Sequence, residues 1–153
     1  MNVVEFLDSK GIRYEMSQHR PTFTAQQMAA EEHVPGMNVA KPVVVCADEK
    51  YYMCVLPACC KIDTDALKKA LGAKKVNLAD EDELTRLFGD CALGAEPPFG
   101  QLYGLETLMD AALENDPYVV FQAGTHEQAI RMSLGDYVKL VQPRVLKFSY
   151  HMQ

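Results

Sequence analysis

Residues 38–47 read NVAKPVVVCA, and this segment says more about the fold than any other in the chain. A short, continuous run of β-branched residues such as Val43–Val45 predicts a strand in the core of a sheet. Pro42 cannot donate a backbone hydrogen bond, so we expect this end of the strand to be an edge or a bulge. The residue before a proline is held extended, which applies here to Lys41.

A second β-rich run, Tyr51 to Leu56, follows the polar tripeptide Asp48-Glu49-Lys50. Two such runs separated by a short polar turn predict a β-hairpin. We also expect Val119-Val120-Phe121 to be a core strand, in the same sheet as Val43–Val45, because both runs are short, apolar and β-branched or aromatic.

The other segments indicate helices and strands in mixed order. Periodicity and capping residues predict helices over Val3–Leu7, Thr24–His33, Asp63–Leu71, Asp80–Phe88 and Leu134–Val141. Strands are expected over Ile12–Met16, Lys75–Leu78, Leu105–Met109, Tyr118–Gln122 and Gln128–Met132, with Val145–Tyr150 as a last strand or a loosely held tail. The fold class expected is α/β: one domain over residues 1–153, with a central mixed, partly closed β-sheet surrounded by helices.

The net charge and the hydropathy of the chain limit which partners we expect it to bind. The net charge of −6 argues against strong nonspecific binding to nucleic acid through counterion release. The lysines at 68, 69, 74 and 75 leave room for a local contact, although a solvated helix face explains them equally well. No apolar run approaches the roughly 20 residues that span a bilayer, so we expect no membrane association and a cytoplasmic location.

The 5 cysteines are odd in number and show no CxxC spacing. This pattern indicates buried thiols rather than a disulfide framework or a zinc site. The chain also contains no Walker loop and no GxGxxG motif, so neither a metal nor a nucleotide cofactor is implied.

A second informative segment is the loop Gly94 to Gly100, which reads GAEPPFG. Glycine lets the backbone approach a ligand, and proline restricts the conformation of the loop. Together with Lys41, a cation at the start of a strand, the loop indicates a pocket for a small polar ligand. Taken singly, Lys41 would be a surface lysine and the segment an ordinary surface loop.

His126 is a third candidate. It follows Gly124-Thr125 at the end of the strand Tyr118 to Gln122. Histidine at such a position can donate, accept or shuttle a proton near neutral pH, although many such residues serve only in a turn. No serine or cysteine lies in a recognisable nucleophile elbow.

Read in order, these segments resemble the YbaK/ProX-type aminoacyl-tRNA deacylases, which are related to the editing domain of bacterial prolyl-tRNA synthetases. The resemblance rests on the ordered set rather than on any single motif, and it covers nearly the whole chain. Its pieces are Tyr14 with His19-Arg20-Pro21 and Thr24, Val39-Ala40-Lys41, Val55-Leu56-Pro57, Ala70 to Val76, Gly94 with Pro98-Phe99-Gly100, and Gly124 with Gly135-Asp136.

The resemblance implies a free-standing enzyme that hydrolyses the ester of mischarged aminoacyl-tRNA, most simply tRNA-Pro carrying Ala, Cys or Ser. It implies no metal, no cofactor and no covalent enzyme intermediate. It places catalytic roles at Lys41 and His126, and substrate contacts at Gly94, Pro98, Gly100 and Gly124. The partners it implies are the tRNA acceptor end and an aminoacyl-tRNA synthetase.

Two residues depart from the family pattern. Pro42 follows Lys41 where a small polar residue is more usual, and Pro97 doubles the loop proline. The alternative is therefore a catalytically silent module of the same fold that binds a tRNA end or a synthetase.

Overall fold

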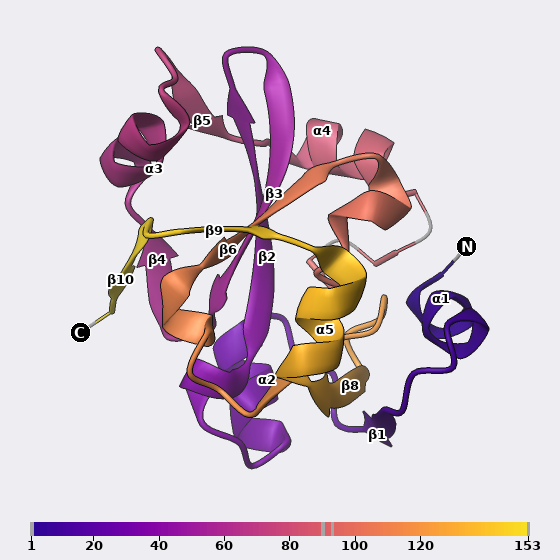
Figure 1. The fold of residues 1–153 in the computed structure, drawn as a ribbon. Coiled ribbons are helices and arrows are strands. Elements are labelled where there is room, and N and C mark those ends of the chain that lie inside the picture. The colour runs from indigo at the N-terminus through magenta and orange to yellow at the C-terminus, as the bar shows by residue number, and fades with distance from the viewer. Residues whose placement is uncertain (1, 90, 93, 153) are drawn as a thin grey trace.

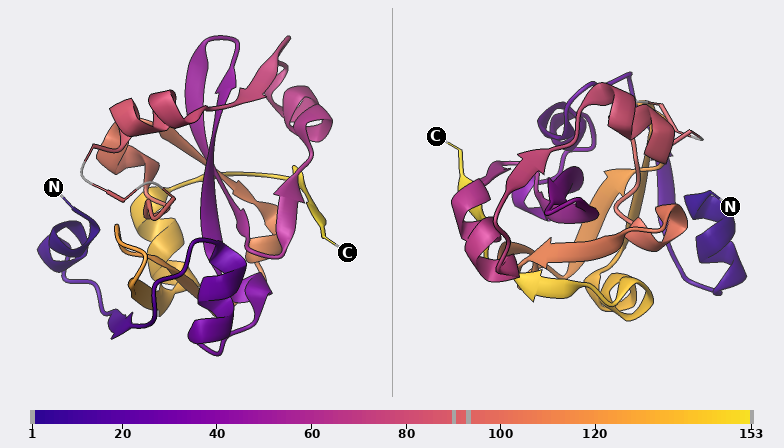
Figure 2. Two further views of the ribbon diagram at one scale, coloured as in Figure 1. Left: turned by 180° about the vertical axis from the view of Figure 1, so that it is seen from behind. Right: turned by 90° about the horizontal axis from the view of Figure 1, so that it is seen from above.

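Three β-sheets and five α-helices build the computed structural model, which describes residues 2–89, 91–92 and 94–152. The helices are α1 (Val3–Ser9), α2 (Ala25–Glu31), α3 (Thr64–Leu71), α4 (Glu81–Leu87) and α5 (Leu134–Val141). Three short 3-10 helices are η1 (Gly36–Asn38), η2 (Gly100–Tyr103) and η3 (Ala111–Leu113). The two chain ends lie on opposite sides of the molecule (Figures 1 and 2).

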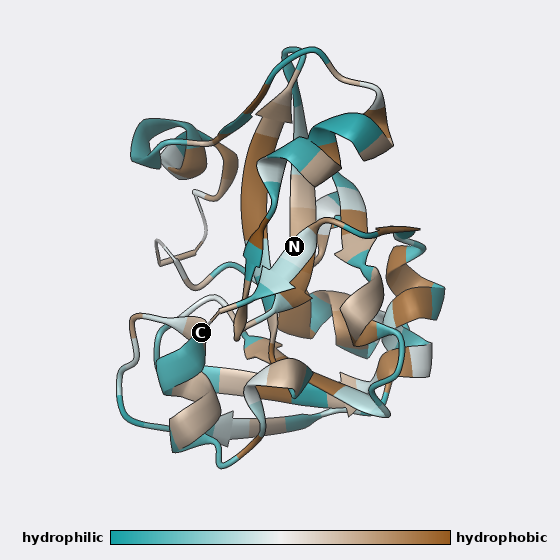
Figure 3. Ribbon diagram, turned by 90° about the vertical axis from the view of Figure 1, so that its left-hand side faces the viewer, coloured by the Kyte–Doolittle hydropathy of each residue, from teal (hydrophilic) through white to brown (hydrophobic). Residues whose placement is uncertain are grey.

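The largest sheet has the order β5-β2-β3-β6-β9. Its strands are β5 (Val76–Leu78), β2 (Ala40–Ala47), β3 (Lys50–Pro57), β6 (Glu106–Asp110) and β9 (Arg144–Leu146). β2 pairs antiparallel with β3 and β5, whereas β3 with β6 and β6 with β9 are parallel pairs. The mixed α/β fold and the β2–β3 hairpin are thus confirmed. Hydrophobic residues concentrate on the strands of the hairpin, and its tip is hydrophilic (Figure 3).

Partial closure of the sheet is not found. In the part of the chain that the structure describes, β5 and β9 are the two open edges of the five-stranded sheet. The other strands form two smaller sheets, β1-β8-β7 and β10-β4. Their strands are β1 (Glu15–Gln18), β4 (Cys60–Ile62), β7 (Tyr118–Gln122), β8 (Gln128–Ser133) and β10 (Ser149–His151).

The expectation that Val43–Val45 and Val119–Phe121 share one sheet is wrong. The first run lies in β2 of the five-stranded sheet, and the second lies in β7 of the three-stranded sheet. A single parallel bridge between Val39 and Val120 joins the two sheets. The apolar pattern predicted burial correctly, since Val44, Val45 and the run in β7 are buried. Burial does not determine which strand becomes the neighbour.

The predicted edge at Pro42 is confirmed on one side of β2. β5 pairs only with Val45 to Ala47, so the half of β2 that holds Pro42 has β3 as its one ladder partner. The edge of this half that β3 does not cover faces the segment between α4 and β6, including Gly94 and Glu96.

Capping residues define the helix ends as the sequence predicts. Thr24 accepts a hydrogen bond of 3.0 Å from the Gln27 amide, and Asp80 with Glu83 completes a capping box at α4. The Gln27 side chain accepts from the Phe23 amide at 2.9 Å, one residue before the position that a capping box requires. Gly72 ends α3 in the left-handed region, with φ of 64°.

The two ends of the chain depart most from the predicted boundaries. The first strand is β1, which begins at Glu15 rather than at Ile12, and all four of its residues are exposed. The last segment forms two short strands, β9 and β10, instead of one. An exposed strand carries no alternation of buried and exposed residues, so its boundaries are poorly marked in the sequence.

An aromatic cluster at the centre of the core holds the loop that precedes η2. The ring of Phe99 lies 5.3 Å from the ring of Phe121 and 5.3 Å from that of Tyr137, in edge-to-face geometry. Tyr137 also donates a hydrogen bond of 2.6 Å to the Pro98 carbonyl. The loop is therefore anchored at Pro98–Phe99, and its earlier part is held against β2 and β7.

Candidate functional site

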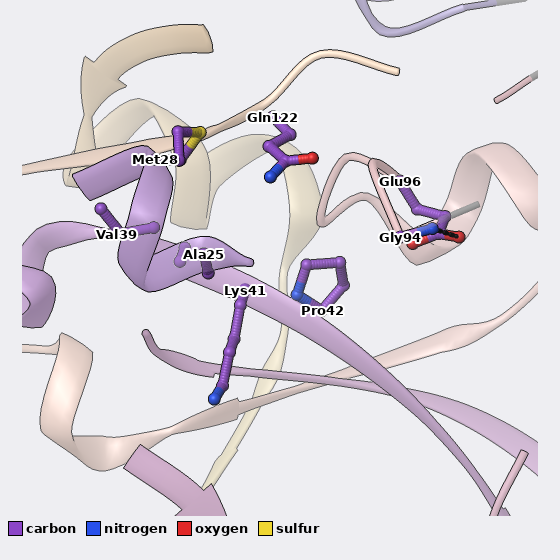
Figure 4. Close-up of a pocket in the computed structure, with 9 residues that line it drawn as sticks. Ala25, Met28, Val39, Lys41, Pro42, Gly94, Glu96 and Gln122 are labelled. Atoms are coloured by element: carbon purple, nitrogen blue, oxygen red, sulfur yellow. Dashed lines mark hydrogen bonds between the residues drawn. The ribbon is translucent and has the colours of Figure 1, made fainter. Parts of the chain in front are cut away.

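A small pocket lies between the N-terminal part of α2, the beginning of β2, the loop at Gly94–Glu96 and the end of β7 (Figure 4). Its volume is about 130 Å³. The lining residues are Ala25, Met28, Val39, Ala40, Lys41, Pro42, Gly94, Glu96 and Gln122. Most of the wall is apolar, and the polar side chains are few, which is the usual composition of a small-molecule site.

Backbone hydrogen bonds bring these four segments together. The bridge from Val39 to Val120 lays β7 along the start of β2. The Gly124 amide donates to the Ala95 carbonyl at 2.9 Å, and the Ala92 amide donates to the Gly124 carbonyl at 2.9 Å. The turn after β7 is thus tied to the loop on both sides of Gly94. Gly124 has φ of 97°, a conformation that favours glycine. Gly124 does not line the pocket; its two backbone hydrogen bonds hold the loop beside the pocket.

Gly94 is exposed at the pocket, as the prediction of a close backbone approach requires. Its φ is 86°, and its amide donates a hydrogen bond of 2.9 Å to the Glu96 carboxylate. A Cβ placed on Gly94 would lie 3.5 Å from Cε1 of His126. The structure therefore brings two of the predicted site residues, Gly94 and His126, next to each other.

His126 is partly buried at the edge of this arrangement. Its carbonyl accepts a hydrogen bond of 3.0 Å from the Thr22 amide, which holds the segment before α2 against it. Its ring centroid lies 5.4 Å from that of Phe23, whose side chain is 72% exposed. His126 does not line the pocket but borders it across Gly94.

Lys41 lines the pocket, yet its amine points away from Pro42, Gly94 and Gln122 (Figure 4). The Nζ atom donates a hydrogen bond of 3.3 Å to the Ala58 carbonyl. Burial lowers the pKa of the Lys41 ammonium, because desolvation penalises the charged form. The expectation that this ammonium faces the Gly/Pro loop is therefore not met.

The pleat of β2 explains the orientation of Lys41. Ala40 and Val44 pack in the cluster that contains Phe99, whereas Val43 and Val45 pack in the cluster around Leu67 and Phe148. Successive side chains of a strand point to opposite faces, so Lys41 shares the face of Val43 and Val45. Pro42, on the other face, is the residue that points toward the loop.

Pro98 and Gly100 lie in the core rather than in the pocket lining. The Gly100 amide donates to Oγ1 of Thr107 at 3.0 Å. A Cβ on Gly100 would lie 2.4 Å from the same oxygen and 2.6 Å from the Leu105 carbonyl oxygen. In this structure the second half of the loop positions the first half, and a direct substrate contact at Pro98 or Gly100 remains a prediction.

Glu96 and Gln122 are pocket residues that the sequence did not reveal as site residues. Each side chain is 7% exposed. Glu96 was visible only as the one charge in the Gly/Pro loop, and Gln122 only as the polar last residue of an apolar strand. A polar residue that ends a buried strand beside a glycine turn is the signal that could have identified Gln122.

Metal-binding side chains do not gather in the described part of the chain: no group of three or more His, Cys, Asp or Glu residues could hold a metal ion there. The five cysteines are thiols rather than disulfides. Burial raises the pKa of Cys54 to about 12, so this thiol is not a nucleophile near neutral pH.

None of the helices in the described ranges is both long enough and apolar enough to cross a membrane.

Known proteins share this fold and sequence pattern. Residues 19–140 match the aminoacyl-tRNA editing domain family. The chain is 25% identical over 146 residues to the prolyl-tRNA editing protein ProX of Acetoanaerobium sticklandii, which covers 91% of this chain and 88% of that protein.

Solved structures agree on the fold. The crystal structure of the hypothetical protein APE2540 superimposes with a TM-score of 0.87 at 22% identity, covering 97% of this chain and 99% of that one. A protein proposed as a trans-editing enzyme for prolyl-tRNA synthetase gives a TM-score of 0.85 at 21% identity, covering 97% and 94%. These features define an α/β domain of the YbaK/ProX type. The chain belongs to the aminoacyl-tRNA editing domain family.

Proposed function

We propose that this protein is a trans-acting aminoacyl-tRNA deacylase, which hydrolyses the ester between a wrong amino acid and the 3′ end of a tRNA. Its substrate is tRNA-Pro carrying alanine, cysteine or serine, and its site of action is the cytoplasm. The observation that carries the proposal is that Lys41 and Gly94, which lie in distant segments, line one small pocket. The match of residues 19–140 to the editing family supports the same reaction.

The pocket suits a small aminoacyl group. Ala25, Met28 and Val39 offer an apolar surface for its side chain, and the volume of about 130 Å³ limits its size. Exclusion of larger aminoacyl groups is then steric. The tRNA backbone remains outside, in keeping with an acidic protein that gains most of its tRNA affinity from a synthetase partner.

Ester hydrolysis in this site needs a positioned nucleophile and donors for the developing oxyanion. A water, or a hydroxyl or thiol of the substrate itself, supplies the nucleophile. His126, next to Gly94, tunes the bound ester or water and transfers a proton. The Lys41 ammonium binds the 3′-terminal oxygens of the tRNA. To reach them, it first breaks its single hydrogen bond of 3.3 Å to the Ala58 carbonyl.

The alternative, a catalytically silent binding module, is favoured by one observation. The Lys41 amine lies on the face of β2 opposite to the loop, and Pro42 occupies the position that points toward the loop. A module of this kind would bind the tRNA end or the synthetase without releasing the amino acid.

Single-turnover release of the amino acid from mischarged tRNA-Pro separates the two functions. The deacylase proposal expects release of alanine, cysteine or serine by the wild-type protein, at rates that fall in the Lys41→Ala variant. Correctly charged prolyl-tRNA-Pro is the control for selectivity. Binding of mischarged tRNA with no release from any of the three would establish the silent module instead.

A further inference from the structure

Glu96 is a buried carboxylate without a cation. Its side chain is 7% exposed, and within the described ranges both ion pairs involve Glu106 and none involves Glu96. Among the described residues, its carboxylate accepts one hydrogen bond, from the Gly94 amide at 2.9 Å. A carboxylate has about four acceptor sites, and a buried charge is normally compensated by a cation or by several donors.

Gln122, on the same pocket wall, carries an unsatisfied polar atom. Its side chain is 7% exposed, and its amide oxygen is buried with no hydrogen-bond partner among the described residues. That oxygen points from the end of β7 toward the side of the pocket that holds Gly94 and Glu96 (Figure 4). Buried amides are nearly always hydrogen-bonded. An unpaired amide oxygen beside a pocket therefore indicates that a ligand donates a hydrogen bond to it.

The cationic side chain in the pocket lining, that of Lys41, does not neutralise Glu96. Lys41 directs its amine to the Ala58 carbonyl, away from Glu96 and Gln122. The other lining residues have apolar side chains, apart from Gly94, which has none. The lining residues thus supply two acceptors, one of them negatively charged, and this combination favours a ligand with a cationic donor group.

We propose that Glu96 and Gln122 bind the α-ammonium group of the aminoacyl ester. This inference rests on the proposed deacylase function and specifies how its substrate is recognised. The ammonium has three donors and no acceptor, which matches a carboxylate and an amide oxygen. The apolar lining at Ala25 and Met28 then receives the amino-acid side chain. The site is selective for aminoacyl groups whose amine is free.

A loop-stabilising role for Glu96 is the structural alternative, because its carboxylate holds the Gly94 amide. The substitution Glu96→Gln separates the two roles. Glutamine keeps the acceptor oxygen and the shape, so the loop bond to Gly94 is retained, whereas the negative charge is lost. Gln122→Met removes the second acceptor at similar size. Glu114→Gln, at the exposed residue that follows η3, is the matched control for loss of charge.

The test uses two stable probes, 3′-alanylamino-3′-deoxyadenosine and its Nα-acetyl derivative, whose amide bond resists hydrolysis. Calorimetry of the wild-type protein should show that acetylation weakens binding by about 10-fold or more, the scale of one hydrogen bond to a charged group. Glu96→Gln should bring the two affinities within about 3-fold of each other, and Gln122→Met should reduce the difference partially. Glu114→Gln should behave as wild type.

Equal affinity of the wild-type protein for the two probes, or binding of neither, would overturn the inference. Gln122→Met keeps the inference testable if Glu96→Gln fails to fold, which thermal unfolding reports. Release of alanine from alanyl-tRNA-Pro is measured separately. Hydrolysis with no preference for the free amine would leave the deacylase standing and remove this recognition mode. Preference for the free amine with no hydrolysis would support the recognition mode and contradict the deacylase.

Discussion

Gly94 and His126 are neighbours at the edge of the pocket: a Cβ on Gly94 would lie 3.5 Å from Cε1 of the imidazole. The contact is an ordinary van der Waals distance, so a methyl group alone would fit beside the ring. The φ of 86° at Gly94 would strain any residue with a side chain. A larger side chain would also enter the space beside His126 and Glu96.

We therefore expect Gly94→Val to block the aminoacyl group while the fold persists. The variant should lose about 1–3 kcal/mol of unfolding free energy, the usual cost of a non-glycine residue in this region. Its deacylation rate should fall on every accepted substrate. Gly72→Val is the matched control, since Gly72 also has a positive φ of 64° but has no atom within 4 Å of an added Cβ. Wild-type turnover by Gly94→Val would remove the loop from the site.

His126→Ala should reduce the single-turnover rate by about 10²-fold, within the range for loss of one acid–base group. The physical reason is the position of the ring beside Gly94, at the edge of the proposed ester site. His151→Ala, at the exposed last residue of β10, is the control for loss of a histidine elsewhere. Mass spectrometry of the quenched reaction should find no acyl group on His126. A trapped acyl-enzyme there would contradict the non-covalent scheme.

Lys41→Ala should reduce deacylation by about 10²–10³-fold, the scale for one well-placed electrostatic group. Its melting temperature should stay near that of the wild type, because the amine makes one hydrogen bond of 3.3 Å. Lys41→Arg should restore little, since a planar guanidinium does not replace a compact ammonium. Lys139→Ala removes an exposed lysine of α5 as the control. Equal rates for the wild type and Lys41→Ala would refute the mechanism.

The pH dependence follows from the same lysine. Burial lowers the pKa of Lys41, so the ammonium loses its proton at a lower pH than an exposed lysine does. If the charged form holds the substrate, the rate constant falls as pH rises through this lowered pKa. Enzyme-dependent deacylation, corrected for spontaneous ester hydrolysis, should show that alkaline limb in the wild type. The Lys41→Ala variant should react more slowly, and its pH–rate profile should not show this alkaline decrease.

Gly100→Ala tests whether the second half of the loop is structural. An added Cβ would lie 2.4 Å from Oγ1 of Thr107 and 2.6 Å from the Leu105 carbonyl oxygen, closer than real contacts allow. We expect a loss of about 1–3 kcal/mol in urea unfolding, the typical cost of overpacking a core. Gly135→Ala, in α5 with no atom within 4 Å of an added Cβ, should be near neutral. A stable Gly100→Ala protein with altered amino-acid selectivity would instead support a substrate contact at Gly100.

Local chemistry accounts for what could be read from the residues alone. The apolar runs of β2 and β7 predicted buried strands, the polar turn at Asp48–Lys50 predicted the hairpin, and caps such as Thr24 and Asp80 marked where helices begin. Each of these signals depends only on residues within a few positions of one another. It can therefore be read from the sequence without knowledge of the fold.

The orientation of Lys41 could not be read in the same way. β2 packs against one cluster through Ala40 and Val44 and against another through Val43 and Val45, so apolar residues occur at successive positions. A strand buried on both faces shows no alternation, and the sequence then does not reveal which face a given residue takes.

Residue pattern alone determined the α/β class, the positions of most helices and strands, and the ordered set of segments that marks the editing family. Tertiary structure alone decided that β2 and β7 belong to different sheets joined at Val39 and Val120, and that Glu96 and Gln122 face one pocket. The physical reason is that helix and strand formation depends on local periodicity, whereas a pocket depends on contacts between distant segments. Those contacts are set by the packing of the whole core around Phe99.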